Sequence, residues 1–251
     1  MTTVTPGPYL EDGARRLGLT LEPAQTGLFL RYLDLLARER QNLTTLTSPV
    51  EIVEKHFLDS LTVALAVEAG PVGPVLDVGS GAGFPGIPLK ILWPGILLVL
   101  LEPRVKRALF LENAVHALGL PGVLVVKARA EDYLRDPQAR EKFGLVTARA
   151  VAPLAVLAEY CLPAVAPGGL WVAQKGPEAA RELEEAKDAL EFLGGGPAIV
   201  RQLELPYSGA LRTLVTVPKV ENTPADYPRR AGIPGKRPLA GKKAKGGEYS
   251  P

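Results

Sequence analysis

The sequence predicts an α/β protein: a doubly wound, mostly parallel sheet with an antiparallel hairpin at one edge, preceded by helices. First, short apolar segments of strand length alternate with helix-like segments from residue 74 onward, which is typical of right-handed βαβ units. Second, no helical segment separates the last two apolar runs, so we expect them to form a hairpin. Third, the apolar residues of segment 1–70 recur at helical spacing.

We therefore expect three parts: a helical segment (1–70) packed on the core, the core itself (71–218), and a basic tail rich in proline and glycine (219–251).

The N-terminal part should contain amphipathic helices. Residues 22–40 place apolar side chains on one face and charges on the other. The polar residues 41–49 predict a connection that caps the next helix, at 50–69. His56 lies on that helix, and we expect it to make a structural hydrogen bond rather than to act as a catalyst.

Strands and helices should alternate through the core. The expected strands are 75–78, 96–101, 123–126, 145–148, 169–174, 199–205 and 212–217. The expected helices are 85–92, 104–118, a segment from Pro153 through Cys161, and 178–193. Ligands of such sheets bind beyond the carboxyl ends of the strands, where the strand order reverses.

A glycine-rich turn follows the first expected strand. Gly79, Gly81 and Gly83 allow a sharp bend and a close approach of the backbone to a ligand. Glu102, at the end of the next strand, stands where a ribose diol would be held. This spacing fits both a nicotinamide dinucleotide and S-adenosylmethionine. Asp77 favours S-adenosylmethionine. A carboxylate would repel a pyrophosphate, whereas it would attract a cofactor that carries a sulfonium and an ammonium group.

The ends of the third and fourth strands add candidates to this site. Ala130 is small enough for an adenine ring to lie flat against the backbone. Glu131 either contacts the cofactor or offsets the dipole of a short helix. Arg149 ends a buried strand, so it must find an anion in the cleft. A salt bridge to Glu102 or Glu131 is the alternative.

The sequence is poor in catalytic groups. The fourth strand lacks an Asn/Asp-Pro-Pro-Tyr/Phe motif, and the single cysteine, Cys161, falls inside a helix. One cysteine also excludes an internal disulfide and a cysteine-based metal cluster. Methyl transfer to a ring nitrogen with a free lone pair needs no proton removed, so it can rest on alignment and electrostatics. We expect no metal.

No stretch reaches the ~18 apolar residues of a membrane span, and no signal pattern opens the chain, so we expect a cytoplasmic protein with no membrane contact. The net charge of +2 hides an asymmetry: residues 219–251 hold eight Lys and Arg against three acidic residues. A basic tail on a mildly acidic body predicts contact with a polyanion. The alternative is a solvated tail that only keeps the protein soluble.

Several motifs together resemble one family, the bacterial small-subunit ribosomal RNA guanine-N7 methyltransferases, formerly called glucose-inhibited division protein B. The motifs are Asn42-Leu43-Thr44, the segments 56–61 and 77–88, Lys106-Arg107, Arg149-Ala150-Val151, Lys175-Gly176 and segment 227–234. The resemblance covers about residues 40–238. Many members carry Asp-Ser where this chain has Glu102-Pro103-Arg104.

The resemblance implies a class I S-adenosylmethionine-dependent fold and methylation of guanine 527 in 16S rRNA. It also implies cofactor contacts by Gly79, Phe84, Ala130, Glu131 and Arg149. With the strand-end argument, the candidate cofactor residues are Gly79, Gly81, Phe84, Glu102, Pro103, Arg104, Ala130, Glu131 and Arg149.

We expect Arg149 to position the base between cofactor and RNA. The candidate RNA contacts are Arg149, Lys175, Arg229, Arg230, Lys236 and Arg237. The expected partner is 16S rRNA or the small ribosomal subunit, bound by a monomer. Two other functions stay open: an NAD(P)-binding oxidoreductase and a non-catalytic rRNA-binding assembly factor. The lysine-rich stretch after Leu239 lies beyond the resemblance.

Overall fold

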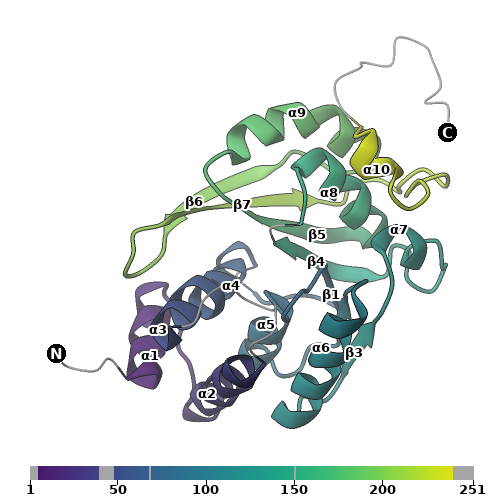
Figure 1. The fold of residues 1–251 in the computed structure, drawn as a ribbon. Coiled ribbons are helices and arrows are strands. Elements are labelled where there is room, and N and C mark those ends of the chain that lie inside the picture. Colours follow the sequence, from purple (N-terminus) through teal and green to yellow (C-terminus); the bar gives the residue numbers. More distant parts are fainter. Residues whose placement is uncertain (1–4, 40–47, 68, 150, 240–251) are drawn as a thin grey trace.

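The computed structural model describes residues 5–39, 48–67, 69–149 and 151–239. A seven-stranded sheet in the order β3-β2-β1-β4-β5-β7-β6 forms the centre, with helices on both faces (Figure 1). The strands are β1 (Val75–Val78), β2 (Leu98–Leu101), β3 (Val123–Val126), β4 (Phe143–Arg149), β5 (Val165–Lys175), β6 (Ile199–Glu204) and β7 (Leu211–Pro218).

The first five strands run parallel, and the last two pair antiparallel to their neighbours. This confirms the predicted mostly parallel sheet with an antiparallel hairpin at one edge. β5 begins four residues before the expected strand, because Val165 pairs with Phe143 before the ladder shifts register.

The helices form two layers around the sheet (Figure 1). One layer holds α1 (Pro6–Arg16), α2 (Pro23–Arg38), α3 (Pro49–Ile52), the π-helical η1 (Val53–Leu58), α4 (Asp59–Leu61), the 3-10 helix η2 (Thr62–Ala66), α5 (Gly86–Leu92) and α6 (Val105–Leu118). The other holds α7 (Ala130–Tyr133), α8 (Leu154–Cys161), the short η3 (Leu162–Ala164), α9 (Ala179–Phe192) and α10 (Ile233–Lys236).

The helix expected at 50–69 is not one regular α-helix. Its backbone changes from α to π at Val53, back to α at Asp59 and to 3-10 at Thr62. A π segment adds a residue to the turn and re-aims side chains, and such segments are frequent at functional sites. The expected connection at 41–49 lies mostly outside the described residues, and Pro49 already belongs to α3.

The N-terminal helices are docked on the far hairpin through Glu54. Its Oε1 accepts hydrogen bonds from the backbone N–H groups of Tyr207 (3.1 Å) and Ser208 (2.6 Å), in the turn between β6 and β7. The ring of Tyr207 stacks on Tyr9 of α1 at 3.8 Å between centroids. The carboxylate is buried, so the two amides depend on it for satisfaction.

Asp77 joins three elements beneath the glycine-rich turn. Its Oδ2 accepts the N–H of Gly86 at 3.0 Å, at the start of α5, and its Oδ1 accepts the hydroxyl of Thr147 on β4 at 3.3 Å. The side chain has no solvent exposure. Burial raises the pKa of this carboxyl to about 6, against the opposing effect of the Gly86 hydrogen bond.

The described part of the tail, 219–239, packs on the body. The Lys219 ammonium is buried and donates to the backbone carbonyls of Leu162 (2.8 Å) and Leu193 (3.1 Å) and to the Thr223 hydroxyl. Burial lowers the pKa of Lys219 to about 8. Leu239 is also buried. Lys242, Lys243 and Lys245 lie outside the described residues.

Replacing Glu54 tests the docking of the N-terminal helices. Glu54→Ala leaves the amides of Tyr207 and Ser208 without their acceptor, so we expect a loss of about 2 kcal/mol in the free energy of unfolding. Glu51→Ala is the matched control, because the one polar contact of Glu51 with another described side chain is a largely exposed ion pair with Lys55. Urea unfolding of both variants measures the difference, and equal midpoints would rule out this role for Glu54.

The raised pKa of Asp77 predicts a pH dependence of stability. Between about pH 4 and pH 6 the folded protein keeps a proton on Asp77 that the unfolded chain has released. The free energy of unfolding of the wild type should therefore fall as the pH rises through this window. Asp77→Asn lacks this titration and should gain stability relative to the wild type, by up to about 1.4 kcal/mol per pKa unit.

Urea titrations of the wild type and Asp77→Asn at a series of pH values measure this difference. The exposed Asp132, replaced by Asn, serves as the control. Parallel pH curves for wild type and Asp77→Asn would contradict a raised pKa.

Candidate functional site

A pocket of about 440 Å³ opens at the carboxyl ends of β1, β2 and β4. All nine candidate cofactor residues line it: Gly79, Gly81, Phe84, Glu102, Pro103, Arg104, Ala130, Glu131 and Arg149. Ser80 and Ala82, inside the expected turn 79–84, also line it. The wall further includes residues that the sequence did not place there, namely His56, Val78, Leu101, Arg107, Ala128, Arg129, Val151 and Tyr160. That the nine contact a cofactor stays a prediction.

The glycine-rich turn forms one wall of this pocket in a conformation that requires glycine. Gly79, Gly81 and Gly83 have φ values of 72°, 60° and 101°, which L-residues with a side chain rarely adopt. A Cβ on Gly79 would lie 2.7 Å from Val151, and one on Gly83 would lie 2.5 Å from Ile87. At Gly81 the nearest atoms are 3.8 Å and 3.9 Å away, so its backbone faces open space that a ligand can use.

Glu102 is fixed at the tip of β2 by two backbone amides. Its Oε2 accepts the N–H of Gly81 at 2.9 Å, and its Oε1 accepts the N–H of Arg104 at 2.8 Å. The residue is 3% exposed. A carboxylate has about four acceptor sites, so two remain for hydroxyl donors of a ligand. This arrangement fits a ribose diol. The glycine-rich turn beside it allows another part of a ligand to approach the backbone closely.

The side chain of Asp77 does not line the pocket. Its oxygens bond to Gly86 and Thr147 below the turn, whereas the sequence argument used it as an anion beside the cofactor. Any electrostatic effect of Asp77 on a ligand therefore acts from below the pocket. Its direct structural role is to hold α5 against the sheet through these hydrogen bonds.

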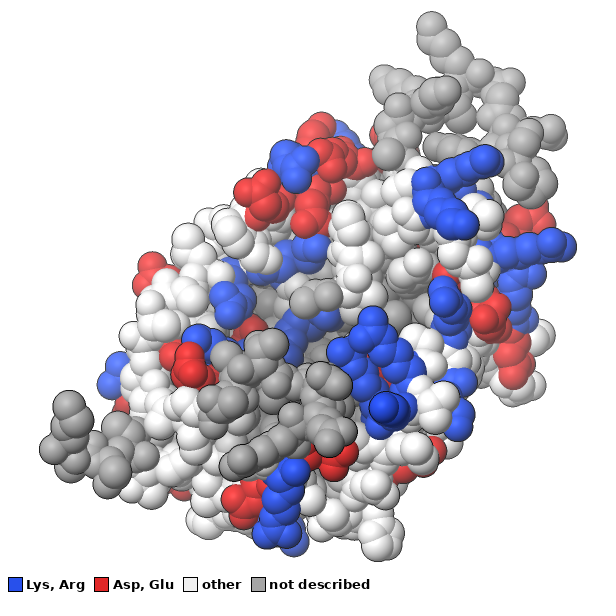
Figure 2. Space-filling model, in the orientation of Figure 1, with Lys and Arg blue, Asp and Glu red and all other residues white. Residues whose placement is uncertain are grey.

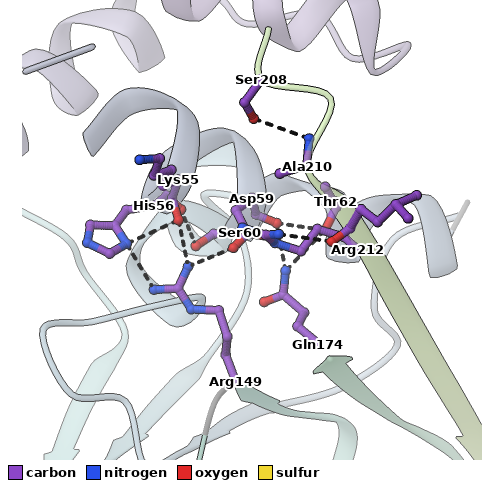
Figure 3. Close-up of polar contacts among 11 residues, drawn as sticks. Lys55, His56, Asp59, Ser60, Thr62, Arg149, Gln174, Ser208, Ala210 and Arg212 are labelled. Carbon is purple, nitrogen blue, oxygen red and sulfur yellow. Dashed lines mark hydrogen bonds and ion pairs between the residues drawn. The ribbon is translucent and has the colours of Figure 1, made fainter. Parts of the chain in front are cut away.

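Arg149 reaches from β4 toward the N-terminal helices (Figure 3). Its Nη1 lies 3.4 Å from Oδ2 of Asp59 and 3.4 Å from the carbonyl oxygen of Lys55. Its Nη2 lies 3.4 Å from Nδ1 of His56. The anion that pairs with Arg149 is thus Asp59, and neither Glu102 nor Glu131 forms the alternative salt bridge.

Asp59 holds two arginines at once. Its Oδ1 accepts a hydrogen bond from Nε of Arg212 on β7 at 3.0 Å, opposite the pair with Arg149 (Figure 3). Its backbone carbonyl accepts the amide of Gln174 on β5 at 2.6 Å. Burial raises the pKa of the Asp59 carboxyl, and the two arginines oppose that rise. The pattern of residues at strand ends could not identify Asp59 as the partner of Arg149, because Asp59 lies on a helix 90 residues earlier in the chain.

His56 and Phe84 form the inner end of the pocket together with Arg149. The His56 ring stacks on Phe84 at 4.6 Å, and the Arg149 guanidinium lies 4.9 Å from the centre of the same ring. Burial and the neighbouring Arg149 lower the pKa of His56 to about 4. The imidazole is therefore neutral at pH 7.

The outer wall of the pocket is tied to the C-terminal segment. Oε1 of Glu131 accepts the N–H of Gly232 at 2.9 Å, just before α10. Burial, followed by the charge of Glu131, raises the pKa of the Tyr160 phenol to about 12, so this hydroxyl stays protonated at pH 7. A residue of the pocket wall thus also positions the tail.

The six candidate RNA contacts differ in their surroundings. The Lys175 ammonium lies 2.7 Å from Glu182 and 3.0 Å from the carbonyl of Ala152. Arg229 makes an ion pair with the buried Glu159 at 2.6 Å. Arg230, Lys236 and Arg237 are exposed. An RNA contact by any of the six stays a prediction, and Lys175 could make one with the third N–H of its ammonium.

Two absences hold for the described residues alone. Within those ranges no cluster of three or more His, Cys, Asp or Glu is placed to hold a metal ion. None of the described helices is long and apolar enough to cross a membrane.

Solved structures show which fold this is. A SAM-dependent O-methyltransferase from Thermotoga maritima matches with a TM-score of 0.52 at 12% identity, over 77% of this chain and 73% of that one. TrmN from Thermus thermophilus matches with a TM-score of 0.52 at 18% identity, over 76% of this chain and 53% of that one. These likenesses confirm the predicted class I methyltransferase fold.

Sequence relatives are much closer. The family model described as rRNA small subunit methyltransferase G matches residues 25–207. Proteins called ribosomal RNA small subunit methyltransferase G are 48% identical in Pelotomaculum thermopropionicum, over 92% of this chain and 97% of that protein, and 48% identical in Symbiobacterium thermophilum, over 92% and 96%. The resemblance inferred from the motifs is confirmed: the chain belongs to the rRNA small subunit methyltransferase G family.

Proposed function

We propose that this chain transfers the methyl group of S-adenosylmethionine to N7 of a guanine in 16S rRNA, with guanine 527 as the target. Family membership supports the reaction class, and the names of the relatives support the small-subunit RNA. The observation that carries the proposal is the Glu102 carboxylate, fixed beside the open face of Gly81 in a pocket at the strand ends. The predictions of a cytoplasmic monomer and of no metal stay predictions.

The residues present fit the cofactor. Glu102 would accept hydrogen bonds from the ribose hydroxyls, the turn from Gly79 to Phe84 would border the amino-acid part, and Ala130 would leave room for the adenine ring. When bound, S-adenosylmethionine supplies an electrophilic methyl group on a sulfonium. The acidic pair Asp77 and Glu102 near the turn favours a cationic ligand over a pyrophosphate.

The chemistry asks little of the protein in proton transfer. N7 of guanine carries a lone pair in the ring plane and no proton, so attack on a methyl group needs no general base. The titratable groups of the pocket fit this, because a pKa of about 4 makes the His56 imidazole a weak base and Tyr160 keeps its proton at pH 7. The protein then contributes the alignment of nucleophile and methyl group and the exclusion of water.

Arg149 is the residue best placed to orient the base. Arginine often bonds both O6 and N7 of guanine, but a donor on N7 would block the attacking lone pair. Its useful partners are therefore O6 of the base or a phosphate. The ion pair with Asp59 holds the guanidinium in the pocket wall before any substrate arrives.

The direct test incubates unmodified 16S rRNA, or small subunits lacking the modification, with the protein and cofactor. Mass spectrometric mapping should find one added methyl group on one guanine. Tighter retention of radiolabelled NAD than of S-adenosylmethionine would favour an oxidoreductase. RNA binding without methyl transfer to either substrate would favour a non-catalytic assembly factor.

Replacing Glu102 tests the cofactor site. Glu102→Ala loses charge-assisted hydrogen bonds worth ~1.5–3 kcal/mol each, so cofactor affinity should fall about tenfold or more while the protein stays folded. Glu112→Ala, on the exposed face of α6, is the control and should bind normally. Isothermal titration calorimetry measures both, and an unchanged dissociation constant for Glu102→Ala would remove this residue from the site.

Replacing Arg149 separates charge from geometry. Arg149→Lys keeps a cation near Asp59 but loses the planar fork, so the rate of methyl transfer should fall about tenfold or more at saturating cofactor. Stability should change little. Arg201→Lys is the control, since Arg201 is an exposed β6 arginine that bonds only the carbonyl of Leu65 among the described residues. Equal turnover by Arg149→Lys would mean that only the charge matters.

A further inference from the structure

A second groove, of about 850 Å³, lies outside the cofactor pocket. It runs between the segment after α7 and the C-terminal segment that leads into α10. The described residues that line it are Leu134, Arg135, Arg140, Ala225, Asp226, Tyr227, Pro228, Arg229, Arg230, Ile233 and Arg237. We call it the arginine groove, because five of these residues are arginines and only Asp226 is acidic.

Two of the arginines build the groove. The Arg140 guanidinium donates to the backbone carbonyls of Thr223 at 2.6 Å, Pro224 at 3.0 Å and Tyr227. Arg229 bonds both oxygens of Glu159, which has no solvent exposure. These bonds hold the C-terminal segment in place, so the wall of the groove is preformed.

The other three arginines face solvent along this wall. Arg135, Arg230 and Arg237 are all exposed. Arg135 makes one long contact, 3.3 Å from Nη2 to the carbonyl of Pro228. Among the described residues no acceptor pairs with the guanidinium of Arg230 or Arg237. Figure 2 shows Lys and Arg side chains gathered over α10 and beside α7, with a few acidic side chains among them.

We propose that the arginine groove binds the sugar-phosphate backbone of the RNA substrate, away from the methylated base; this rests on the proposed function. The planar guanidinium matches two phosphate oxygens at once. Three such groups on a fixed wall offer a spaced row of phosphate sites. A single aspartate among five arginines leaves the groove with an excess of positive charge, which suits a polyanion.

The position of the groove fits a strand that also enters the pocket. Glu131 of α7 lines the cofactor pocket and bonds Gly232. Leu134, three residues after Glu131, and Ile233, directly after Gly232, line the groove. A single short helix therefore separates the two hollows. RNA with its target base in the pocket can cross α7 and lay its backbone on the arginines.

The packing of the tail argues against a mere solubility role for residues 219–239. Burying the Lys219 ammonium and the Glu159 carboxylate carries a desolvation cost that is offset only by their fixed partners. A tail that served only to carry charge would gain nothing from this anchoring. Anchoring is useful when the exposed arginines must stand at fixed positions.

Neutralising the exposed arginines tests the proposal. Each phosphate contact contributes ~0.7 to the slope of log affinity against log salt on single strands. Arg230→Gln with Arg237→Gln should therefore lower the slope by about 1.4, and adding Arg135→Gln should lower it further. The dissociation constant for 16S rRNA fragments is measured over a potassium chloride series. Cofactor affinity and the melting temperature should stay at wild-type values.

A matched control removes the same charge elsewhere. Arg15→Gln with Arg31→Gln changes two exposed arginines of α1 and α2, on the opposite side of the sheet. This pair should leave the slope close to that of the wild type. Point substitutions are preferred to truncation after Val217, which would also remove the buried Lys219 and the Gly232 bond to Glu131.

The outcomes separate the groove from the proposed function. If the groove variant keeps the wild-type slope while the protein methylates RNA, the arginine groove is not an RNA site and the proposed function stands. If the slope falls as expected but neither protein methylates RNA, the groove stands and the proposed function fails. Equal loss of slope in the control pair would overturn the groove, because general charge would explain it. So would unchanged RNA binding together with lost binding of an acidic protein.

Discussion

The structure depends on one buried carboxylate, that of Asp59. It belongs to the N-terminal helices, yet its two partners, Arg149 and Arg212, lie on β4 and β7. A buried charge is tolerated only when it is well paired, so the helices cannot move from the sheet without exposing a costly set of charges. His56 therefore lines the pocket, and Arg149 keeps its partner Asp59, only while the N-terminal part is docked.

A second consequence concerns the balance of charge in the pocket. The acidic side chains there accept hydrogen bonds from backbone N–H groups: Glu102 from Gly81 and Arg104, and Glu131 from Gly232. Each carboxylate fixes a backbone segment and also lines the cavity. A site assembled from such anchors is rigid before a ligand binds, which is what a reaction based on alignment requires. It also explains why no cluster of proton-transfer groups is needed for this chemistry.

The features that could be predicted from the sequence are those that depend on local residue patterns. Strand and helix alternation, the hairpin edge and the glycine-rich turn all follow from spacing, and Glu102 was found by its distance from that turn. The partner of Arg149 was not predictable this way, because Asp59 lies on a helix and only the packing of that helix against β4 brings them together. The π segment in η1 was missed for a similar reason, since tertiary packing sets the local winding. The hydrogen bonds of Asp77 to Gly86 and Thr147 were not predictable either, because only the packing of α5 and β4 shows which way its oxygens face.

The anchored C-terminal segment has an evolutionary consequence. The groups that fix its path, such as Lys219 and Arg229, are separate from the solvent-facing arginines along it. Selection can therefore exchange the outward side chains one at a time without disturbing the fold. The length of the segment is less free, because each insertion or deletion between these anchors would pull one of them out of register. Divergence in this region should thus proceed by substitution rather than by change of length.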